Sequence, residues 1–481
     1  MIKNLFLRKP MKANFADEEH GMKRHLGWFQ LIVIGIGAII GAGIFVITGT
    51  ASATYAGPAI VLSFALAAII CVLAGLCYAE LSAMIPIAGG SYSYAYIALG
   101  ELPAWIIGWS ITAQMIFSIA TVAAGWAGYL TNFLKDWSIV ISSHYGLAPL
   151  QYDVAMGWTL SGSLINLPAM LLILFVGIMV AIGIKAAANF NSILVVIKLC
   201  TVALFIIIGI PHINPENWVP FIPQNGGVFG EFGWSGIARA AGLVFFAYIG
   251  FDTVSTLAQE SKNPQKNLPR GILGSLGICT IAYIAVAAIL TGVVSYKLLN
   301  VPDPMSVALD AMGPSYFWVS TIVKIAILAG LSSVVLIQLL GQTRIFLAIG
   351  KDGLLPKAFG KIHSRTKTPI AATLITTVVV MILAGVFPVA ILGQLVSMIT
   401  LFIFAVVCLG VLVLRRTHPE FKRPFKVPLV PWVPLLGILA CVGQMVVLPA
   451  VTWLQMLLWF AIGFIIYFAY GMKNSKLRGA R

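Results

Sequence analysis

Charged residues are scarce in this chain of 481 residues. Only 9% of them are Asp, Glu, Lys or Arg, whereas 60% are hydrophobic and the mean hydropathy is +0.99. Water-soluble domains carry about 25% charged residues, so the composition excludes that class. The polar first 27 residues contain no short apolar core with a cleavage site, and we expect no removable signal peptide.

Histidine and cysteine are also sparse, with six of each. All six cysteines fall within apolar stretches, and none has metal-ligand spacing with a histidine, so we interpret them as small packing residues. The sequence contains no phosphate-binding glycine loop, no HExxH motif and no nucleophile elbow. We therefore expect no enzymatic activity, no metal and no cofactor.

Long apolar runs dominate the chain. Runs of about 20 residues are typical of membrane-spanning helices, and they predict an all-α polytopic membrane protein with twelve transmembrane helices. The runs cover residues 27–56, 58–85, 101–131, 167–184, 192–212, 236–259, 270–294, 317–349, 369–388, 394–414, 430–450 and 452–471. Residues 1–26 and 472–481 are the tails of this arrangement.

The positive charge follows the predicted topology. A net charge of +15 would suit a nucleic-acid partner, but the basic residues are not clustered in that way. With the amino terminus inside, 25 of the 30 Lys and Arg residues lie in cytoplasmic segments, and only Lys135 and Lys297 lie in outer loops. This asymmetry predicts a protein of the inner membrane, surrounded by the lipid bilayer, with both termini in the cytoplasm. It also indicates that the basic charge is a topology signal, and we expect no nucleic-acid partner.

Glycines interrupt the first apolar run, in the stretch GAIIGAGIF at residues 37–45. Gly41 and Gly43 would let the helix break there, although Gly37 and Gly41 also fit close helix packing of the GxxxG type. Non-helical backbone at membrane depth is tolerated only where it is buried or lines a cavity. A break would expose N–H groups that favour an anion and carbonyls that favour a cation, which together suit a zwitterionic amino acid.

The sixth run carries a second anomaly, GLVFFAYIGFDTVSTLAQE at residues 242–260. Asp252 lies near its middle, where a carboxylate is costly, and it follows an expected break from Ala247 to Gly250. The two breaks are five runs apart, so the second set of runs has inverted topology. Interrupted segments in matching positions of two inverted halves indicate the binding site of a transporter.

Several motifs together resemble the amino acid–polyamine–organocation superfamily, most closely bacterial members similar to cationic amino acid transporters. These motifs are GAIIGAGIF at 37–45, YAEL at 78–81, FFAYIGFD at 245–252, ESKNPQKNLPRGI at 260–272 and GQTRIFLAIGKDGLLP at 341–356. The resemblance implies a five-plus-five inverted repeat of the leucine-transporter type, with repeats at 27–212 and 236–414 and two further helices at 430–471.

The resemblance also implies a substrate site. N–H groups of the first break would bind the substrate carboxylate, and carbonyls of both breaks would bind its ammonium group. The N–H groups are those of Ala42, Gly43 and Ile44, and the carbonyls are those of Ile39, Ile40, Phe246, Ala247 and Ile249. Close relatives usually carry a hydroxyl residue where this chain has Ala42, so carboxylate binding here must depend more on backbone.

Lys198 in the fifth run resembles the lysine that replaces sodium in proton-coupled relatives. Its ammonium group would reach carbonyls of the first run and the hydroxyls of Ser332 and Ser333 in the eighth. Burial of a lysine this far inside a run also favours a proton switch, although an ion pair or a snorkelling side chain is the alternative.

Gln114 and Gln338 occupy positions that face the substrate side chain in relatives. Some relatives have a glutamate at the first of these positions, so the neutral amide predicts small or polar neutral amino acids rather than arginine or lysine. Both amides fit helix–helix hydrogen bonding equally well.

Three further charged residues have open roles. Glu80 near the cytoplasmic interface either serves an inner gate or holds YAEL against a loop, and we favour the second. Arg239 and Lys324 either line an outer vestibule or pair with acids such as Glu231 or Asp310.

The sequence as a whole predicts a secondary active amino acid transporter, with proton-coupled symport by alternating access as the expected mechanism. An exchanger is the alternative within this class. A membrane-embedded sensor is a more distant one, because the chain has no sizeable extramembrane domain.

Overall fold

The computed structural model describes residues 5–8, 26–85, 90–153, 157–182, 187–257, 260–363, 366 and 368–479. Eight helical segments of this part are long and apolar enough to cross a membrane. They are Gly43–Met84, Glu101–Asp136, Ile193–His212, Gly233–Ser255, Pro264–Val293, Pro314–Lys351, Val389–Thr417 and Ala450–Arg478. Four shorter apolar helices accompany them, and each of the twelve predicted runs overlaps one or more of these segments.

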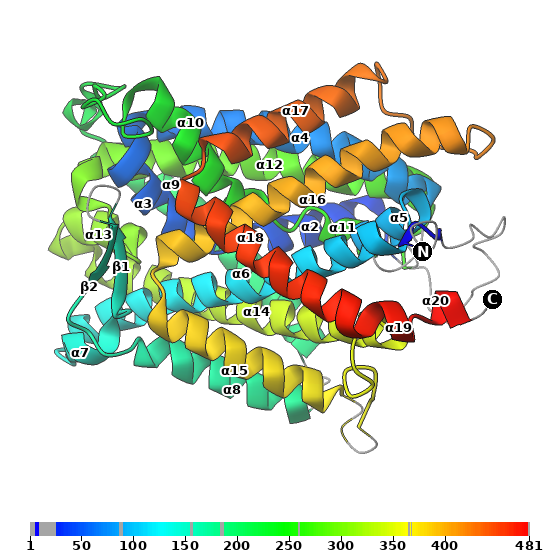
Figure 1. Ribbon diagram of the computed structural model, residues 1–481. Coiled ribbons are helices and arrows are strands. Elements are labelled where there is room, and N and C mark those ends of the chain that lie inside the picture. Colours follow the sequence, from blue (N-terminus) through cyan, green and yellow to red (C-terminus); the bar gives the residue numbers. More distant parts are fainter. Residues whose placement is uncertain are drawn as a thin grey trace.

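The main helices run lengthwise through one bundle, in which α18 crosses α16 at a clear angle (Figure 1). Their bounds are α2 Trp28–Ile39, α4 Ile60–Met84, α6 Glu101–Asp136, α8 Leu167–Ile182, α9 Ala187–Gly209, α10 Gly233–Val244, α12 Pro264–Val293, α14 Phe317–Lys351, α15 Ile370–Val386, α16 Val389–Thr417, α17 Trp432–Val447 and α18 Ala450–Ile466. Helix α12 packs along both α2 and α4, whereas α6 packs along α14 and α16. These contacts bury the middle of the bundle, including the interrupted first segment.

Several helices extend beyond the apolar runs that predicted them. α12 begins at Pro264 rather than at residue 270, α6 continues to Asp136 rather than 131, and α16 begins at Val389 rather than 394. Proline is well suited to the first turn of a helix, where its missing N–H is not needed. Hydropathy does not detect the polar first turns of α12 and the polar last turn of α6, whereas the missed first residues of α16 are apolar.

Smaller elements also lie between the predicted runs. At one end of the bundle these are α7 (Ser143–Gly146), α13 (Pro304–Ala311) and an antiparallel hairpin in which β1 (Leu150–Asp153) pairs with β2 (Gly157–Leu160) (Figure 1). At the other end, α5 (Gly90–Ala98) precedes α6, and α19 (Met472–Asn474) and α20 (Lys476–Gly479) follow α18.

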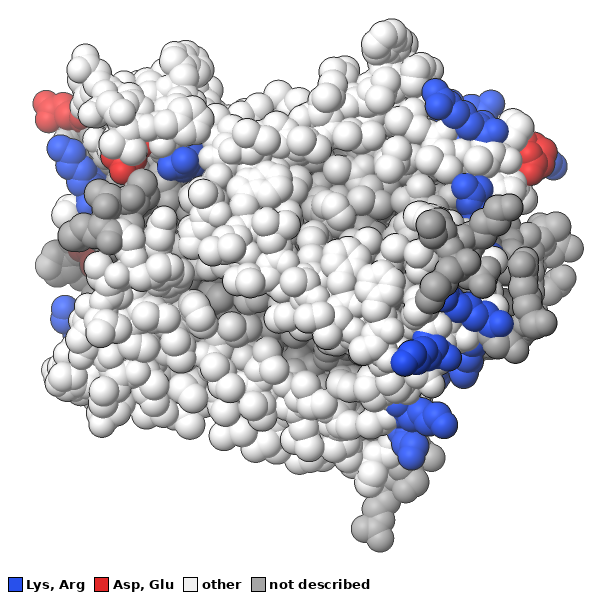
Figure 2. Space-filling model, in the orientation of Figure 1, with Lys and Arg blue, Asp and Glu red and all other residues white. Residues whose placement is uncertain are grey.

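The described segments nearest the two chain ends meet at one end of the bundle. The carbonyl of Leu7 accepts a hydrogen bond from the Glu101 N–H, and the Arg478 side chain donates to the Glu101 carboxylate. Figure 2 shows a broad band without charged residues, and most Lys and Arg side chains visible on this face gather at that same end. Positive charge and both chain ends therefore share one side of the apolar band.

Candidate functional site

The first helix is interrupted in the middle of its apolar sequence. α2 ends at Ile39, and Ile40 adopts an extended conformation with ψ of 106°. Helical structure resumes at Gly43 with a wide π-type turn, Gly43–Ile47, and continues through Thr48–Ala51 and Ser52–Ala56. The hydroxyl of Thr48 donates to the Gly43 carbonyl at 3.1 Å. The break therefore leaves carbonyls at the end of α2 and N–H groups at the start of the following segment outside a continuous helix.

A second interruption lies between α10 and the short helix α11 (Thr253–Thr256). α10 gives way to a 3-10 turn, Phe245–Tyr248, and the chain then passes through Gly250 with φ of +122°. A Cβ at Gly250 would lie 2.5 Å from the Ala38 carbonyl oxygen. Both the left-handed backbone and this close contact require glycine.

The two interruptions contact each other directly. A Cβ at Gly43 would lie 2.2 Å from the Cα of Ala247, so the two backbones touch. The hydroxyl of Tyr283, on α12, lies 2.9 Å from the carbonyl oxygens of both Ile39 and Ala247. Because it donates toward both, Tyr283 connects the two breaks. No local pattern pointed to this residue, which is a tyrosine in an otherwise ordinary apolar run.

Lys198 lies beside the same break. Its Nζ is 3.3 Å from the carbonyl oxygens of Gly37 and of Ile40, and the residue is only 1% exposed. The stem of the side chain packs against α14, where a Cβ at Gly330 would lie 2.9 Å from the Lys198 Cγ. The ammonium group thus sits between α9, the carboxyl end of α2 and α14.

The two serines expected near Lys198 bond elsewhere. Ser332 donates to the carbonyl of Leu328 and Ser333 to that of Gly330, both within α14. Among the described residues, neither hydroxyl contacts Lys198. A serine inside an apolar helix satisfies its hydroxyl on its own preceding turn, and both serines do so here.

The other predicted site residues are distributed over these elements. Ala42, Ile44 and Phe246 are buried at the two breaks, and Ile249 is half-buried. Gln114 is buried on α6, and α14, which carries Gln338, packs along α6. The Oε1 atom of Gln338 is buried and has no hydrogen-bond partner in the described part of the chain, which favours neither proposed role.

Lys324 belongs to an ion-pair network at the end of the bundle that carries α13. It is fully buried, and its Nζ lies 2.8 Å from Asp136 and 3.0 Å from Asp310. Pairing with a loop acid was the expected alternative to a vestibule role, and it is confirmed for Lys324. Arg239 differs, because it donates to the Val447 carbonyl and lies 5.5 Å from the ring centre of Phe229.

Glu80 holds YAEL against a loop, as the favoured interpretation required. Its carboxylate accepts two hydrogen bonds from Arg415, at 3.0 and 2.6 Å, and one from the Val427 N–H at 2.7 Å. Glu80 is 1% exposed. The bidentate pair with Arg415 joins the end of α16 to α4, and the bond from Val427 holds the loop after α16 against α4.

Comparison with known proteins agrees with this architecture. A family model described as amino acid permease matches residues 26–470. The chain is 42% identical over 477 residues to the methylthioribose transporter of Bacillus subtilis (strain 168), covering 99% of this chain and 100% of that protein. It is 41% identical to the branched-chain amino acid permease BcaP of the same organism, covering 98% and 99%. The vacuolar cationic amino acid transporter 4 of Arabidopsis thaliana is 36% identical, covering 84% and 65%.

Proposed function

The chain belongs to the amino acid permease family of the amino acid–polyamine–organocation superfamily, and from that premise we propose that it is a proton-coupled symporter of neutral amino acids. Amino acid transport follows from the family itself. The proton, the mechanism and the substrate side chain are our proposals. The contact between the two helix breaks, with Tyr283 connecting them, is the observation that supports a substrate site built from their backbones.

The breaks offer complementary groups for a zwitterion. We assign the substrate carboxylate to the N–H groups of Ala42, Gly43 and Ile44, where the outer helical segment begins. The ammonium group is assigned to carbonyls at the end of α2 and in the second break, namely those of Ile39, Phe246, Ala247 and Ile249. The Ile40 carbonyl, which was predicted with them, accepts a hydrogen bond from Lys198 instead. Helix amino ends attract anions and carboxyl ends attract cations, which supports this orientation.

The proposed architecture has twelve spans. Residues 27–212 and 236–414 form two inverted repeats of five spans, each of which begins with an interrupted helix, and residues 430–471 add two more. The tails, residues 1–26 and 472–481, lie on the cytoplasmic side of the inner membrane. The concentration of Lys and Arg at the end where the chain ends meet supports this orientation (Figure 2).

Lys198 is the proposed coupling residue, with the protonated ammonium group holding the Gly37 and Ile40 carbonyls. Loss of the proton toward the cytoplasm would release the carboxyl end of α2. The proton would thus bias an equilibrium between outward-facing and inward-facing forms. Ser332 and Ser333 remain in the proposed coupling region because α14 packs against Lys198 at Gly330.

Neutral side chains around the substrate favour a neutral substrate. Gln114 and Gln338 carry no charge that would attract arginine or lysine. One relative is named as a branched-chain amino acid permease, which agrees with this. Another is named as a methylthioribose transporter, and its identity extends over the whole chain, so a neutral thioether sugar is the second candidate substrate.

Uptake by proteoliposomes tests the proposal. We expect neutral amino acids to accumulate when an inward proton gradient is imposed, without any need for sodium. Uptake that needs a second amino acid inside the vesicle would instead indicate an exchanger, and binding without accumulation would indicate a sensor. Competition by methylthioribose, which lacks both zwitterionic groups, would contradict the assignment of the backbone groups if it exceeded that of every amino acid.

A further inference from the structure

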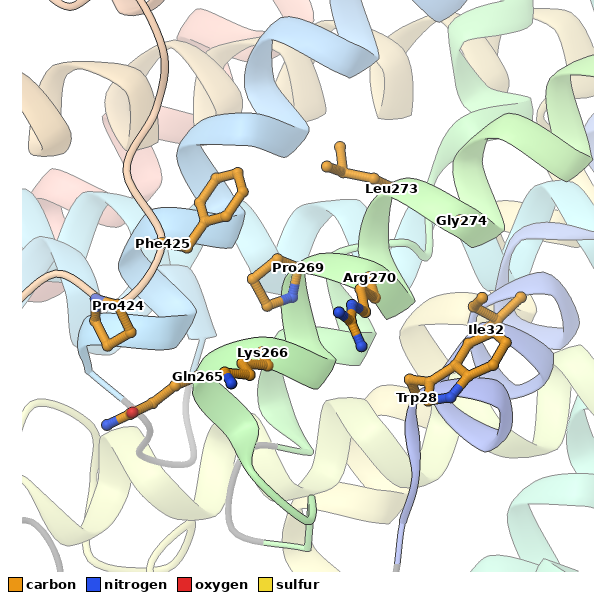
Figure 3. Close-up of a pocket in the computed structure, with 10 residues that line it drawn as sticks. All are labelled: Trp28, Ile32, Gln265, Lys266, Pro269, Arg270, Leu273, Gly274, Pro424 and Phe425. Atoms are coloured by element: carbon orange, nitrogen blue, oxygen red, sulfur yellow. The ribbon is translucent and has the colours of Figure 1, made fainter.

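A pocket of about 850 Å³ lies at the start of α2 and α12, away from the helix breaks (Figure 3). Three segments line it, namely the first turns of α2, the first turns of α12 and the loop after α16. Its lining residues are Trp28, Ile32, Gln265, Lys266, Pro269, Arg270, Leu273, Gly274, Pro424 and Phe425. No aspartate or glutamate is among them.

The lining has a basic part and an apolar part. Lys266 and Arg270 are one helical turn apart on α12, so they share a face, and both are exposed. Neither forms an ion pair with another described residue. Leu273 continues this face one turn further along α12, and α2 contributes Trp28 and Ile32 on the other side (Figure 3). Two cations without an acidic partner in the described part of the chain therefore adjoin a half-exposed apolar groove.

We propose that this pocket binds an anionic phospholipid of the leaflet at this end of the protein. The phosphate of the headgroup would lie between Lys266 and Arg270, and the first part of an acyl chain would lie against Trp28, Ile32 and Leu273. Basic pockets between transmembrane helices at the cytoplasmic side suit such headgroups. A free phosphate would use the cations but not the groove, which is why the lipid is the occupant we choose.

The bound lipid would support the packing of α2 on α12. Small residues of α12 lie directly under α2, since a Cβ at Gly274 would be 2.7 Å from Ile32 and one at Gly271 would be 2.8 Å from Leu31. A ligand that contacts both helices at their first turns holds them together. The far end of α2 is the break itself, so the lipid would stabilise the arrangement of the site seen in this structure.

Native mass spectrometry of the purified full-length protein tests the proposal directly. Dioleoyl phosphatidylglycerol and dioleoyl phosphatidylcholine are titrated separately, and glycerol 3-phosphate serves as the soluble anion. We expect phosphatidylglycerol to bind about 30-fold more tightly than phosphatidylcholine, since each basic residue near an anionic surface contributes about 1 kcal/mol. Equal affinity for the two lipids, or equally tight binding of glycerol 3-phosphate, would overturn the proposal.

Two double variants separate the pocket from general surface charge. Lys266→Gln with Arg270→Gln should abolish the preference for phosphatidylglycerol. Lys357→Gln with Lys361→Gln removes the same charge from exposed positions after α14 and should leave the preference unchanged. If both double variants lose the preference for phosphatidylglycerol, or if neither does, the result contradicts a specific site. Trp28→Ala should weaken the binding of both lipids to a similar extent. Because none of these measurements uses a transport substrate, their results are independent of the transport proposal.

Discussion

Gly43 lies directly against Ala247, with room for no side chain between them. A Cβ on Gly43 would be 2.2 Å from the Cα of Ala247, 2.4 Å from its Cβ and 2.9 Å from its backbone nitrogen. Real Cβ atoms do not approach a backbone this closely, so a substitution must move one helix break away from the other. The contact makes the spacing between the two breaks depend on one glycine.

Gly43→Ala should therefore displace the two breaks from each other and lower substrate affinity, while the protein still inserts and folds. We expect a loss of at least about tenfold, which corresponds to about 1.4 kcal/mol of binding free energy. Gly41→Ala is a matched control two positions away. A Cβ at Gly41 would lie 3.7 Å from Val334, an ordinary contact distance, and binding should persist. Substrate affinity of both purified variants, measured by calorimetry, checks the difference. Equal affinities for the two variants would refute the close-contact model of the site.

Tyr283→Phe removes the hydroxyl that connects the two breaks. Two buried carbonyls lose their donor, so we expect a loss of about 1–2 kcal/mol of stability together with weaker substrate binding. Tyr78→Phe is the control, because its buried hydroxyl forms a hydrogen bond with Ser91 and with no other residue that the structure describes. The control should lose stability but keep affinity, as judged by melting temperature and radioligand binding. Unchanged substrate affinity in Tyr283→Phe would remove this residue from the site.

The helix breaks were accessible to sequence reasoning, but their mutual contact was not. Gly41, Gly43 and Gly250 stand out because they lie within apolar runs, and glycine destabilises a helix interior by about 1 kcal/mol relative to alanine. Which backbone lies against Gly43 depends on how distant helices pack, and no local pattern encodes that. Tyr283 was missed for the same reason, since a tyrosine in an apolar run is unremarkable until its neighbours are known.

Polar partners were predicted less well than apolar runs. The expected link from Lys198 to Ser332 and Ser333 came from family resemblance, and the hydroxyls instead bond within α14. Asp136 was not foreseen as a partner of Lys324, because it lies beyond residue 131, where the apolar run ends. Its position follows from the polar last turn of α6, which hydropathy does not detect.

The burial of Asp303 predicts that the stability of the folded protein depends on pH. It lies in the loop before α13, is 7% exposed, and has a buried Oδ2 without a hydrogen-bond partner among the described residues. Burial raises the pKa of its carboxyl to about 7, although the Lys324 ammonium group opposes this rise. The unfolded chain has a pKa of about 3.9 at this residue. The folded protein therefore binds this proton more tightly, and stability falls as the pH rises from about 4 to about 7.

Asp303→Asn cannot ionise and should not show this loss. Its advantage over the wild type should be smallest near pH 4, grow toward pH 7 and remain constant above it, reaching about 4 kcal/mol. Melting temperatures of both proteins across this range measure the difference. A difference that stays constant with pH would show that Asp303 does not titrate as its burial requires.

Lys198 decides between two driving ions. A sodium ion bound at the carboxyl end of α2 would use the same carbonyls, those of Gly37 and Ile40, that now accept from the Lys198 ammonium group. Two cations at such a short distance in a low-dielectric interior would repel each other strongly, so only one of them can occupy this place. The buried lysine therefore favours protons over sodium as the coupling ion.

Lys198→Ala should abolish acid-stimulated accumulation in proteoliposomes while substrate binding is partly retained. The reason is that the backbone groups that bind the substrate remain, whereas the charge that responds to the proton gradient is gone. Lys297→Ala, in an exposed position after α12, is the control and should accumulate substrate like the wild type. Wild-type uptake should rise as the external pH falls. A strict sodium requirement in the wild type, with no response to an imposed pH gradient, would show that the ammonium group of Lys198 has only a structural role, holding α2 to α9.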